Sequence, residues 1–407
     1  MRFLEGVKIA LQSLRAHKLR SFLTLLGVIF GVMTVVAVAA VIEGFFRYVD
    51  RTVTADLGTN TVVLDKYGII TSFEDFITAS RRNKDLTMSD ADYLRERMRT
   101  AQFIGAQGGA GAEVRSTGQK MTDVSVRGMS ASMINIDTTQ PEAGRYISDG
   151  DDEHRRYVAL IGSEIADTLF NRRDVAGREI KIDGLPFEVI GVAKEQGSFF
   201  GQSRDDFVII PLSTYQKMWG ARGSLTISIK APDGVNLQDV QDEARMLMRA
   251  RHRLAYNDKD TFGLVTADAI NNFVQAIFGI IAAVALGVVS ISLVVSGIVI
   301  MNIMLVTVTE RTREIGIRKS LGARRKDILV QFLVEATTLS LVGGLIGLVI
   351  AFGISKLLVA FTPIPAELPL WAAALAIAVS SGVGLVFGIY PAWKAARLDP
   401  IVALRAE

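Results

Sequence analysis

The sequence predicts an α-helical membrane protein with four transmembrane helices and a large α/β extracytoplasmic domain between the first and the second of them. Half of the 407 residues are hydrophobic even without counting glycine, which exceeds the share usual for soluble proteins. The hydrophobic residues gather in one block near the N-terminus and in three blocks near the C-terminus. The stretch between these blocks has an ordinary globular composition.

Four segments are long enough to cross a bilayer, which takes about 20 mainly apolar residues per helix. The first, 22–42, and the second, about 276–308, contain no charged residue. The third runs from about 337 to 361, and its Lys356 lies near one end, where a long side chain can reach the head groups. The fourth runs from 369 to 390. These segments predict four membrane spans.

The short flanks of the spans predict the orientation, because cytoplasmic flanks are enriched in Lys and Arg. The N-terminal flank is basic, since it contains one acid, Glu5, and five basic residues: Arg2, Lys8, Arg15, Lys18 and Arg20. Four spans return the chain to the same side, so both termini are predicted to be cytoplasmic and the membrane to be the bacterial inner membrane. Ala37-Val38-Ala39 resembles a signal peptidase site, but the apolar run exceeds the usual 7–15 residues, which favours an uncleaved anchor.

The segment 44–272 is predicted to form the extracytoplasmic domain, with two β-α-β units around an insertion. The first unit consists of a strand at 59–66, a helix at 86–98 with Thr87 or Ser89 as its N-cap, and a strand at 122–128. The second consists of a strand at 224–231, a helix at 237–254 and a strand at 261–267. This order predicts a split ferredoxin-like fold. Its parts would be 44–128 and 221–272, with a β-rich insertion at 129–220.

The extracytoplasmic segment contains no recognisable catalytic motif. His17, His154 and His252 are far apart in sequence and lack the spacing of metal ligands, so no metal site is predicted. The acidic loop 148–156 lacks the EF-hand pattern and is interpreted as a solvated loop. The absence of cysteine excludes disulfides within the 407 residues.

The membrane segments indicate a protein that depends on a partner for energy. An ion-driven carrier needs ionisable groups within its spans, and these spans have few, chiefly Glu335 and Lys356. The sequence contains no G-x-x-x-x-G-K-[ST] phosphate loop, so ATP is not bound by that route. Three G-x-x-x-G pairs predict close helix packing, either within one chain or between two: Gly27 and Gly31, Gly343 and Gly347, and Gly384 and Gly388.

The charged segment 309–327 lies between the second and third spans. It contains seven basic and three acidic residues, a net charge of +4, which an anchor against anionic head groups would explain. A helix there would also pair Glu314 with Arg318 and align Ile317 with Leu321. Since an anchor needs neither acids, an apolar strip nor glycines, a docking surface is the other interpretation.

The segment "ERTREIGIRKSLGARRKDILVQFLVEA" resembles the corresponding loop of MacB-like permeases, the type VII ABC transporters that include FtsX-like cell-division and lipoprotein-releasing permeases. The start "ALQSLRAHKLRSFLTLLGVIFGV", the segments "AGREIKIDGLPFEVIGVAKE" and "DDFVIIPLSTY", and the end "GIYPAWKAARLDPIVALRAE" also resemble this family, in the right order. The similarity therefore extends along nearly the whole chain.

This resemblance implies domains at 1–43 (amphipathic helix and first span), 44–272 (porter-like subdomain with its insertion) and 273–407 (spans two to four, with a coupling helix at 309–327). It also implies a permease that is not itself an enzyme, paired with a second copy or a paralogue. A dimer of a separate ABC ATPase would bind ATP and Mg and move the permease by mechanotransmission. A periplasmic adaptor protein is a further implied partner. MacB itself carries a fused ATPase domain, and this sequence departs from MacB in that respect.

Within this resemblance, the residues expected to dock the ATPase are Glu310, Arg311, Glu314, Ile315, Gly316, Arg318 and Gly322. Four residues of the tail, Pro391, Arg397, Pro400 and Leu404, either frame the same surface or belong to an amphipathic tail on the membrane. Export of a drug, peptide or lipid-linked substrate is the expected function. Signalling to a sensor kinase or a cell-wall hydrolase is the alternative, and a passive scaffold is a third.

Overall fold

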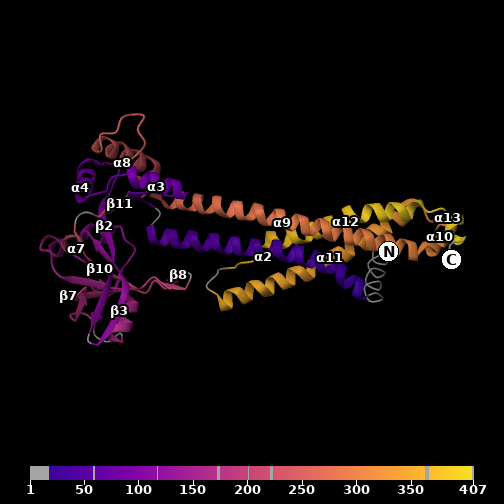
Figure 1. Ribbon diagram of the computed structural model, residues 1–407, viewed down its shortest axis with the longest axis horizontal. Coiled ribbons are helices and arrows are strands. Elements are labelled where there is room, and N and C mark those ends of the chain that lie inside the picture. The colour runs from indigo at the N-terminus through magenta and orange to yellow at the C-terminus, as the bar shows by residue number, and fades with distance from the viewer. Residues whose placement is uncertain are drawn as a thin grey trace. The chain divides into compact units, whose positions relative to one another are not determined.

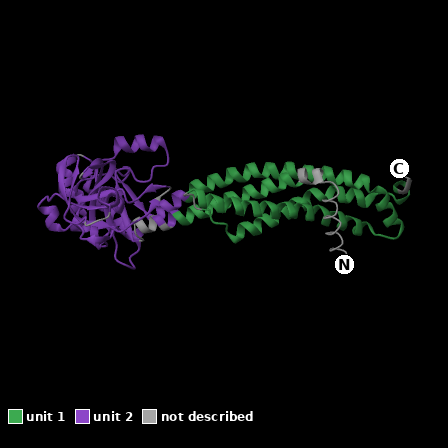
Figure 2. Cartoon of the chain, turned by 90° about the horizontal axis from the view of Figure 1, so that it is seen from below, with its two compact units in different colours: residues 1–48, 275–407 green, residues 49–274 purple. Residues whose placement is uncertain are grey.

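A computed structural model describes residues 18–57, 60–116, 118–171, 175–199, 201–220, 223–362 and 366–405. The chain forms two compact units, one comprising Met1–Tyr48 and Gln275–Glu407 and the other Val49–Val274. We call them the helical unit and the α/β unit; Figure 2 shows them in green and purple. The predicted N-terminal amphipathic helix and His17 lie outside the described residues.

The helical unit contains four helices that are long and apolar enough to cross a membrane, among the residues described. They are α2 (Lys18–Leu57), α9 (Ala267–Glu310), α11 (Arg325–Phe361) and α12 (Leu370–Arg397). Figures 1 and 2 show them side by side, with the short helices α10 (Thr312–Ser320) and α13 (Pro400–Arg405) at one end. The four predicted spans are therefore present.

Two of these helices are much longer than their predicted spans. Helix α2 has 40 residues and α9 has 44. At 1.5 Å per residue they measure about 60 and 66 Å, roughly twice the hydrocarbon thickness. Both continue without a break from the helical unit into the α/β unit. No loop therefore interrupts either helix where it passes from one unit to the other.

The first part of the α/β unit is a four-stranded antiparallel arrangement with two helices. Its elements are β1 (Thr61–Asp65), α4 (Met88–Arg97), β2 (Phe103–Ser116), β11 (Thr226–Lys230), α8 (Leu237–Arg251) and β12 (Gly263–Thr266). Helix α3 (Phe73–Arg82) precedes α4. The strands lie in the order β12-β1-β11-β2, and each adjacent pair is antiparallel. This is the order 4-1-3-2 of two split β-α-β units, as expected of a ferredoxin-like fold.

The second strand of the first unit differs from the prediction. It is β2, which begins at Phe103, and not the segment 122–128, which lies in β3 (Gln119–Met129). Strand β2 contains Gly105, Gly108, Gly109 and Gly111, and glycine is disfavoured in strands. Two of the glycines have a packing reason here, since a Cβ at Gly108 would lie 2.6 Å from the Tyr215 ring and one at Gly105 would lie closer still to the Met133 sulfur.

The inserted part extends the same sheet. Its elements are η1 (Ala131–Asn135), β4 (Pro141–Gly144), α5 (Asp149–Glu153), β5 (Val158–Ile161), α6 (Ser163–Phe170), β6 (Glu179–Ile182), β7 (Leu185–Ala193), β10 (Phe207–Pro211) and α7 (Leu212–Trp219). A small hairpin is formed by β8 (Ser198–Phe199) and β9 (Gln202–Ser203). The sheet continues from β2 in the order β3-β10-β5-β7-β4, and β6 pairs with β2 and β7. Figure 1 shows β10, β7 and β3 together in this part.

The hydrophobic core changes within β2. Ile104 and Ala106 pack with the core below α4 and α8, whereas Ala112 and Val114 pack with the core of the insertion. Val124 and Val126 of β3 also belong to the core of the insertion. The structure thus places the junction inside β2, ahead of the predicted boundary after residue 128.

Candidate functional site

The segment 309–327 is not the single helix that the sequence predicted. Helix α9 continues to Glu310, α10 covers Thr312–Ser320, and α11 begins at Arg325. The turn before α11 needs Gly322, whose φ of +95° is a left-handed conformation that other residues rarely adopt. The Asp327 side chain then accepts a hydrogen bond from the Arg324 N–H at 3.1 Å and caps α11. We call residues 309–324 the coupling loop.

The inner face of the coupling loop packs into the helical unit. The Ile315 side chain is fully buried in a core that also contains Ile328 and Ala395, and Gly316 is buried next to it. Ile315 and Gly316 were predicted as docking residues, and the structure places them on this inner face. Their burial holds α10 against α11 and α12.

Lys319 ties the coupling loop to the end of α12. Its ammonium donates hydrogen bonds to the Ala396 carbonyl at 2.7 Å and to the Leu398 carbonyl at 2.6 Å. A lysine in this position satisfies carbonyls that the helix end leaves unpaired. Burial, and then nearby Arg325, lower the pKa of Lys319 below its ordinary value, while Asp399 opposes the shift. The local sequence does not distinguish Lys319 from the other basic residues of the loop.

Arg311 lies where α9 ends and α10 begins. Its guanidinium forms an ion pair with the Glu335 carboxylate of α11, at 3.3 Å between Nη1 and Oε1. The Glu335 side chain is 7% exposed. This contact joins the start of the loop to α11.

The outer side of the coupling loop carries exposed apolar and acidic residues. They are Glu310 at the end of α9, Glu314 and Ile317 on α10, and Leu321 at the C-cap of α10, with Ile317 at 45% and Leu321 at 83% exposure. Glu314 lies 3.9 Å from Arg318, which also donates to Gln331 at 3.3 Å. We call these four residues the outer stripe.

The C-terminal tail lies beside the coupling loop. Helix α13 packs against α10, and Figure 1 shows the two at the same end of the molecule. Arg397 lies over the Trp393 ring at 3.9 Å, and Pro391 is buried within α12. Pro400 begins α13. The tail therefore lies next to the loop; the side chain of Leu404 lies outside the described residues.

The three glycine pairs lie at helix contacts within one chain. Gly27 and Gly31 face Ser296 and Leu293 of α9, and Gly343 and Gly347 face α2. Gly384 and Gly388 face Ala336 on α11. A Cβ at Gly347 would come 2.8 Å from the Ile29 carbonyl oxygen, so only glycine allows this approach.

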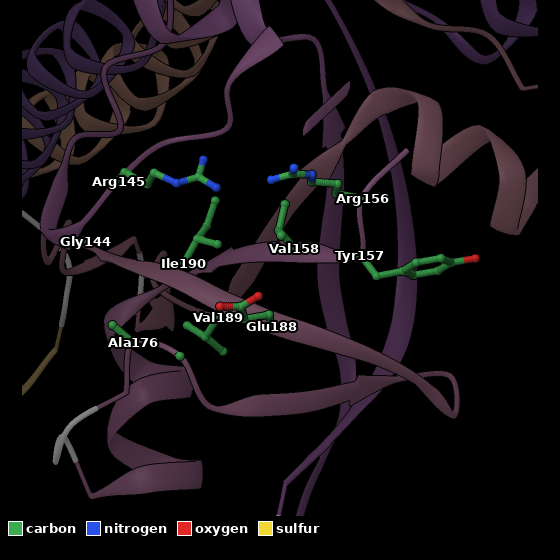
Figure 3. A pocket seen from close by; sticks show the side chains of 10 residues that line it. Gly144, Arg145, Arg156, Tyr157, Val158, Ala176, Glu188, Val189 and Ile190 are labelled. Atoms are coloured by element: carbon green, nitrogen blue, oxygen red, sulfur yellow. The ribbon is translucent and has the colours of Figure 1, made fainter. Parts of the chain in front are cut away.

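A separate pocket of about 740 Å³ lies in the inserted part of the α/β unit. Figure 3 shows Arg145 and Arg156 pointing toward one another there, near Glu188 and Ile190. Arg145 donates two hydrogen bonds to the buried Asp151 carboxylate, at 2.5 and 3.2 Å, and Arg156 lies 3.6 Å from the same carboxylate. Both arginines are thus paired with one acid of the loop 148–156, Asp151.

The contacts of Asp151 predict that the inserted part of the α/β unit loses stability at low pH. The Arg145 guanidinium and the Ser148 hydroxyl and N–H hold the pKa of Asp151 well below its ordinary value, although burial opposes this. A depressed pKa contributes stability above the unfolded pKa of about 3.9 and loses it as pH falls toward the folded pKa. The protection of the amides of residues 148–156, relative to the intrinsic exchange rate at each pH, is expected to fall below about pH 4 in the wild type. Asp151→Asn removes this dependence, and an unchanged pH profile would contradict the assignment.

The described residues contain no group of three His, Asp or Glu side chains placed to hold a metal ion. His154 contacts the Gly150 carbonyl at 2.9 Å, and His252 contacts the Thr261 hydroxyl at 2.7 Å. Both histidines therefore have local structural partners.

Comparison with known proteins agrees with a chain that has an α/β unit between its first and second membrane helices. A family model described as the MacB-like periplasmic core domain matches residues 21–247, and one described as the FtsX-like permease C-terminal matches residues 286–400. The chain is 33% identical over 402 residues to the macrolide export ATP-binding/permease protein MacB of Bdellovibrio bacteriovorus, covering 97% of this chain and 61% of that protein. The chain thus spans about three-fifths of the length of this MacB relative.

A second relative matches over its full length. The chain is 32% identical over 417 residues to an uncharacterized ABC transporter permease of Bacillus subtilis, YknZ, and the alignment covers 100% of both. Among solved structures, the periplasmic region of MacB from Actinobacillus actinomycetemcomitans aligns with 56% of this chain and 98% of its own, at 18% identity and a TM-score of 0.45. The two family models and the two relatives show that the chain belongs to the MacB-like ABC transporter permeases, with a periplasmic core domain and an FtsX-like membrane part.

Proposed function

We propose that this chain is the membrane subunit of an exporter and that an ABC ATPase drives it from the cytoplasmic side. The observation that carries the proposal is the coupling loop, which is rigidly held on one face and carries an exposed apolar and acidic stripe on the other. A solvent-facing loop gains nothing from exposing Leu321, whereas a docking site does. ATP and Mg would bind to the ATPase, which we place on a separate chain that forms a dimer.

The long helices supply a route for coupling. Arg311 links α10 to α11, and α9 continues for 44 residues from the coupling loop into the periplasmic domain. Docking of the ATPase would displace the loop, and α9 would carry the displacement to the periplasmic domain. We therefore propose mechanotransmission, in which the substrate need not cross the bilayer through this chain.

The remaining partners follow from the same proposal. A second copy or a paralogue would complete the permease in the bacterial inner membrane, with both termini in the cytoplasm. A periplasmic adaptor would receive the substrate. Signalling to a kinase or hydrolase is the alternative, and neither relative described above carries such a role in its name.

The outer stripe provides the test of docking. Leu321→Asp places a charge where we expect an apolar contact, and Glu314→Arg reverses a charge. Each is expected to lower recovery of the co-purified ATPase by roughly tenfold, the effect of losing about 1.4 kcal/mol of binding. The measurement is the ratio of ATPase to permease after affinity purification of the full chain.

The matched control is Glu96→Arg, an acid on α4 in the periplasmic domain whose side chain is 73% exposed, against 61% for Glu314. This variant undergoes the same charge reversal and is expected to recover ATPase like the wild type. Wild-type recovery with both Leu321→Asp and Glu314→Arg would exclude the outer stripe as the docking surface.

A further inference from the structure

An apolar cavity lies between three of the membrane helices, in the half of the helical unit from which α2 continues into the periplasmic domain. Its volume is about 350 Å³. Aliphatic and aromatic side chains make up nearly all of its wall, and Glu43 is the one charged residue among those that line it: Val35, Val38, Ala39, Ile42, Glu43, Phe46, Ala282, Ala285, Leu286, Val289, Trp371 and Leu375.

The sequence explains why a cavity remains here. The α2 residues recur at intervals of three and four and so form one helix face, and the α9 residues do the same. Where these faces meet, small side chains stand in place of large ones: Ala39 on α2, and Ala282 and Ala285 on α9. The space equals about a dozen methylene groups, if each occupies roughly the 30 Å³ of a water molecule.

A cluster of charges adjoins the cavity. Arg47 contacts Glu43 with two nitrogens, at 3.0 and 3.1 Å, and contacts Glu367 with a third at 2.7 Å. The Glu367 N–H donates to the Ala40 carbonyl at 3.1 Å, which fixes the segment before α12 to α2. We call Glu43, Arg47 and Glu367 the charge clasp. With two carboxylates and one guanidinium, its formal charge is −1.

We propose that this cavity binds a single-chain amphiphile, with its aliphatic chain between α2, α9 and α12 and an amino head group at the charge clasp. The cavity is a substrate site only if the chain belongs to an exporter, so this inference rests on the proposed function. Lipid tails are as apolar as the cavity wall, so the chain gains only packing there. The selectivity comes from the clasp, because its one net negative charge attracts an ammonium and repels a carboxylate.

The half-exposed state of the clasp agrees with a head-group site. The Arg47 and Glu367 side chains are 50% and 47% exposed, so a ligand can reach them. Glu43 is 29% exposed and lines the cavity itself, so it connects the clasp to the apolar space. A ligand that reaches from the charge clasp into the cavity would pair its amino group with the clasp and fill the cavity with its aliphatic chain.

Photolabelling of the full chain tests the proposal. The chain is placed in phosphatidylcholine nanodiscs and exposed to dodecylamine or dodecanoic acid, each carrying a diazirine in the chain. Labelled peptides are located by mass spectrometry. The amine is expected to label 35–46 and 282–289 roughly tenfold more than the acid does, from a net charge of one at a few ångströms. Equal labelling by amine and acid, or no labelling of these segments, would overturn the proposal.

Variants separate the cavity from the surrounding lipid surface. Ala285→Trp fills the cavity and is expected to remove the amine labelling, whereas Ala283→Trp, an exposed neighbour on α9, leaves it unchanged. Glu367→Gln neutralises the clasp and is expected to reduce the preference for the amine to near one. Equal labelling of the two tryptophan variants would place the probe in bulk lipid and overturn the site.

Two further arms identify the source of the ligand and the level at which a failure occurs. Phosphatidylethanolamine, a two-chain lipid with an amino head, is added to the nanodiscs; displacement of the probe by it would assign the cavity to bilayer lipid and overturn a single-chain cargo. Co-purification of the ATPase is measured on the same samples. Normal recovery of ATPase without labelling rejects this inference and leaves the proposed function standing.

Discussion

Gly384→Leu is expected to separate α12 from α11 and to destabilise the helical unit strongly. A Cβ at Gly384 would meet the Thr337 Cα at 2.7 Å and the Ala336 carbonyl oxygen at 2.8 Å. Both are backbone atoms, so the clash is relieved only if the helices move apart. In lipid, close packing is the main force between helices. The expected destabilisation is about 3 kcal/mol, the upper range for overpacking.

The change is measured as the fraction of folded protein during titration with sodium dodecyl sulfate. Gly382→Leu is the matched control, because a Cβ at this glycine of the same helix has no neighbour within 4 Å. It is expected to unfold like the wild type. Equal loss of stability in both variants would show that helix propensity, and not the α11 contact, dominates.

Arg311→Ala is expected to have the second large effect, on the coupling loop. It removes the arginine contact of the Glu335 carboxylate, whose side chain is 7% exposed, and a hydrogen bond to a charged group contributes about 1.5–3 kcal/mol. The start of α10 should detach from α11, and amide hydrogen exchange in residues 312–320 should accelerate. Recovery of the ATPase should fall as well, although Arg311 is not one of the four residues of the outer stripe.

The double variant Arg311→Met with Glu335→Met provides the control. It removes both charges and keeps side chains of similar length, so it is expected to restore much of the protection of α10. Slow exchange in Arg311→Ala would contradict the role of this ion pair in holding the loop.

The sequence predicted the membrane part well because its signal is long and simple. Uninterrupted apolar runs defined four spans, and the G-x-x-x-G spacing identified positions where helices approach closely, such as Gly347 against Ile29. The lengths of α2 and α9 were underestimated, since beyond the bilayer a helix contains polar residues that resemble an ordinary loop. Hydropathy alone does not detect where such a helix ends.

The α/β unit shows where local pattern fails. The ferredoxin-like order was predicted, but β2 was missed because its glycines lower strand propensity. One of them, Gly108, is needed for contact with Tyr215, about a hundred residues away. The coupling loop shows a related limit. Its outer stripe followed from helical spacing, whereas the inward positions of Ile315 and Lys319 depend on α12, which the local sequence does not contain.

The central claim is that the coupling loop transmits the state of the ATPase to the periplasmic domain. The 407 residues contain no cysteine, so spin labels can be attached at Tyr256→Cys in the α/β unit and Leu370→Cys at the start of α12, both more than 90% exposed in the wild type. The distance between the labels is measured by electron paramagnetic resonance in nanodiscs with the ATPase, with and without ATP. We predict that ATP shifts this distance and that Leu321→Asp abolishes the shift. A shift that persists unchanged in Leu321→Asp, or its absence in the wild type with bound ATPase, would contradict the claim.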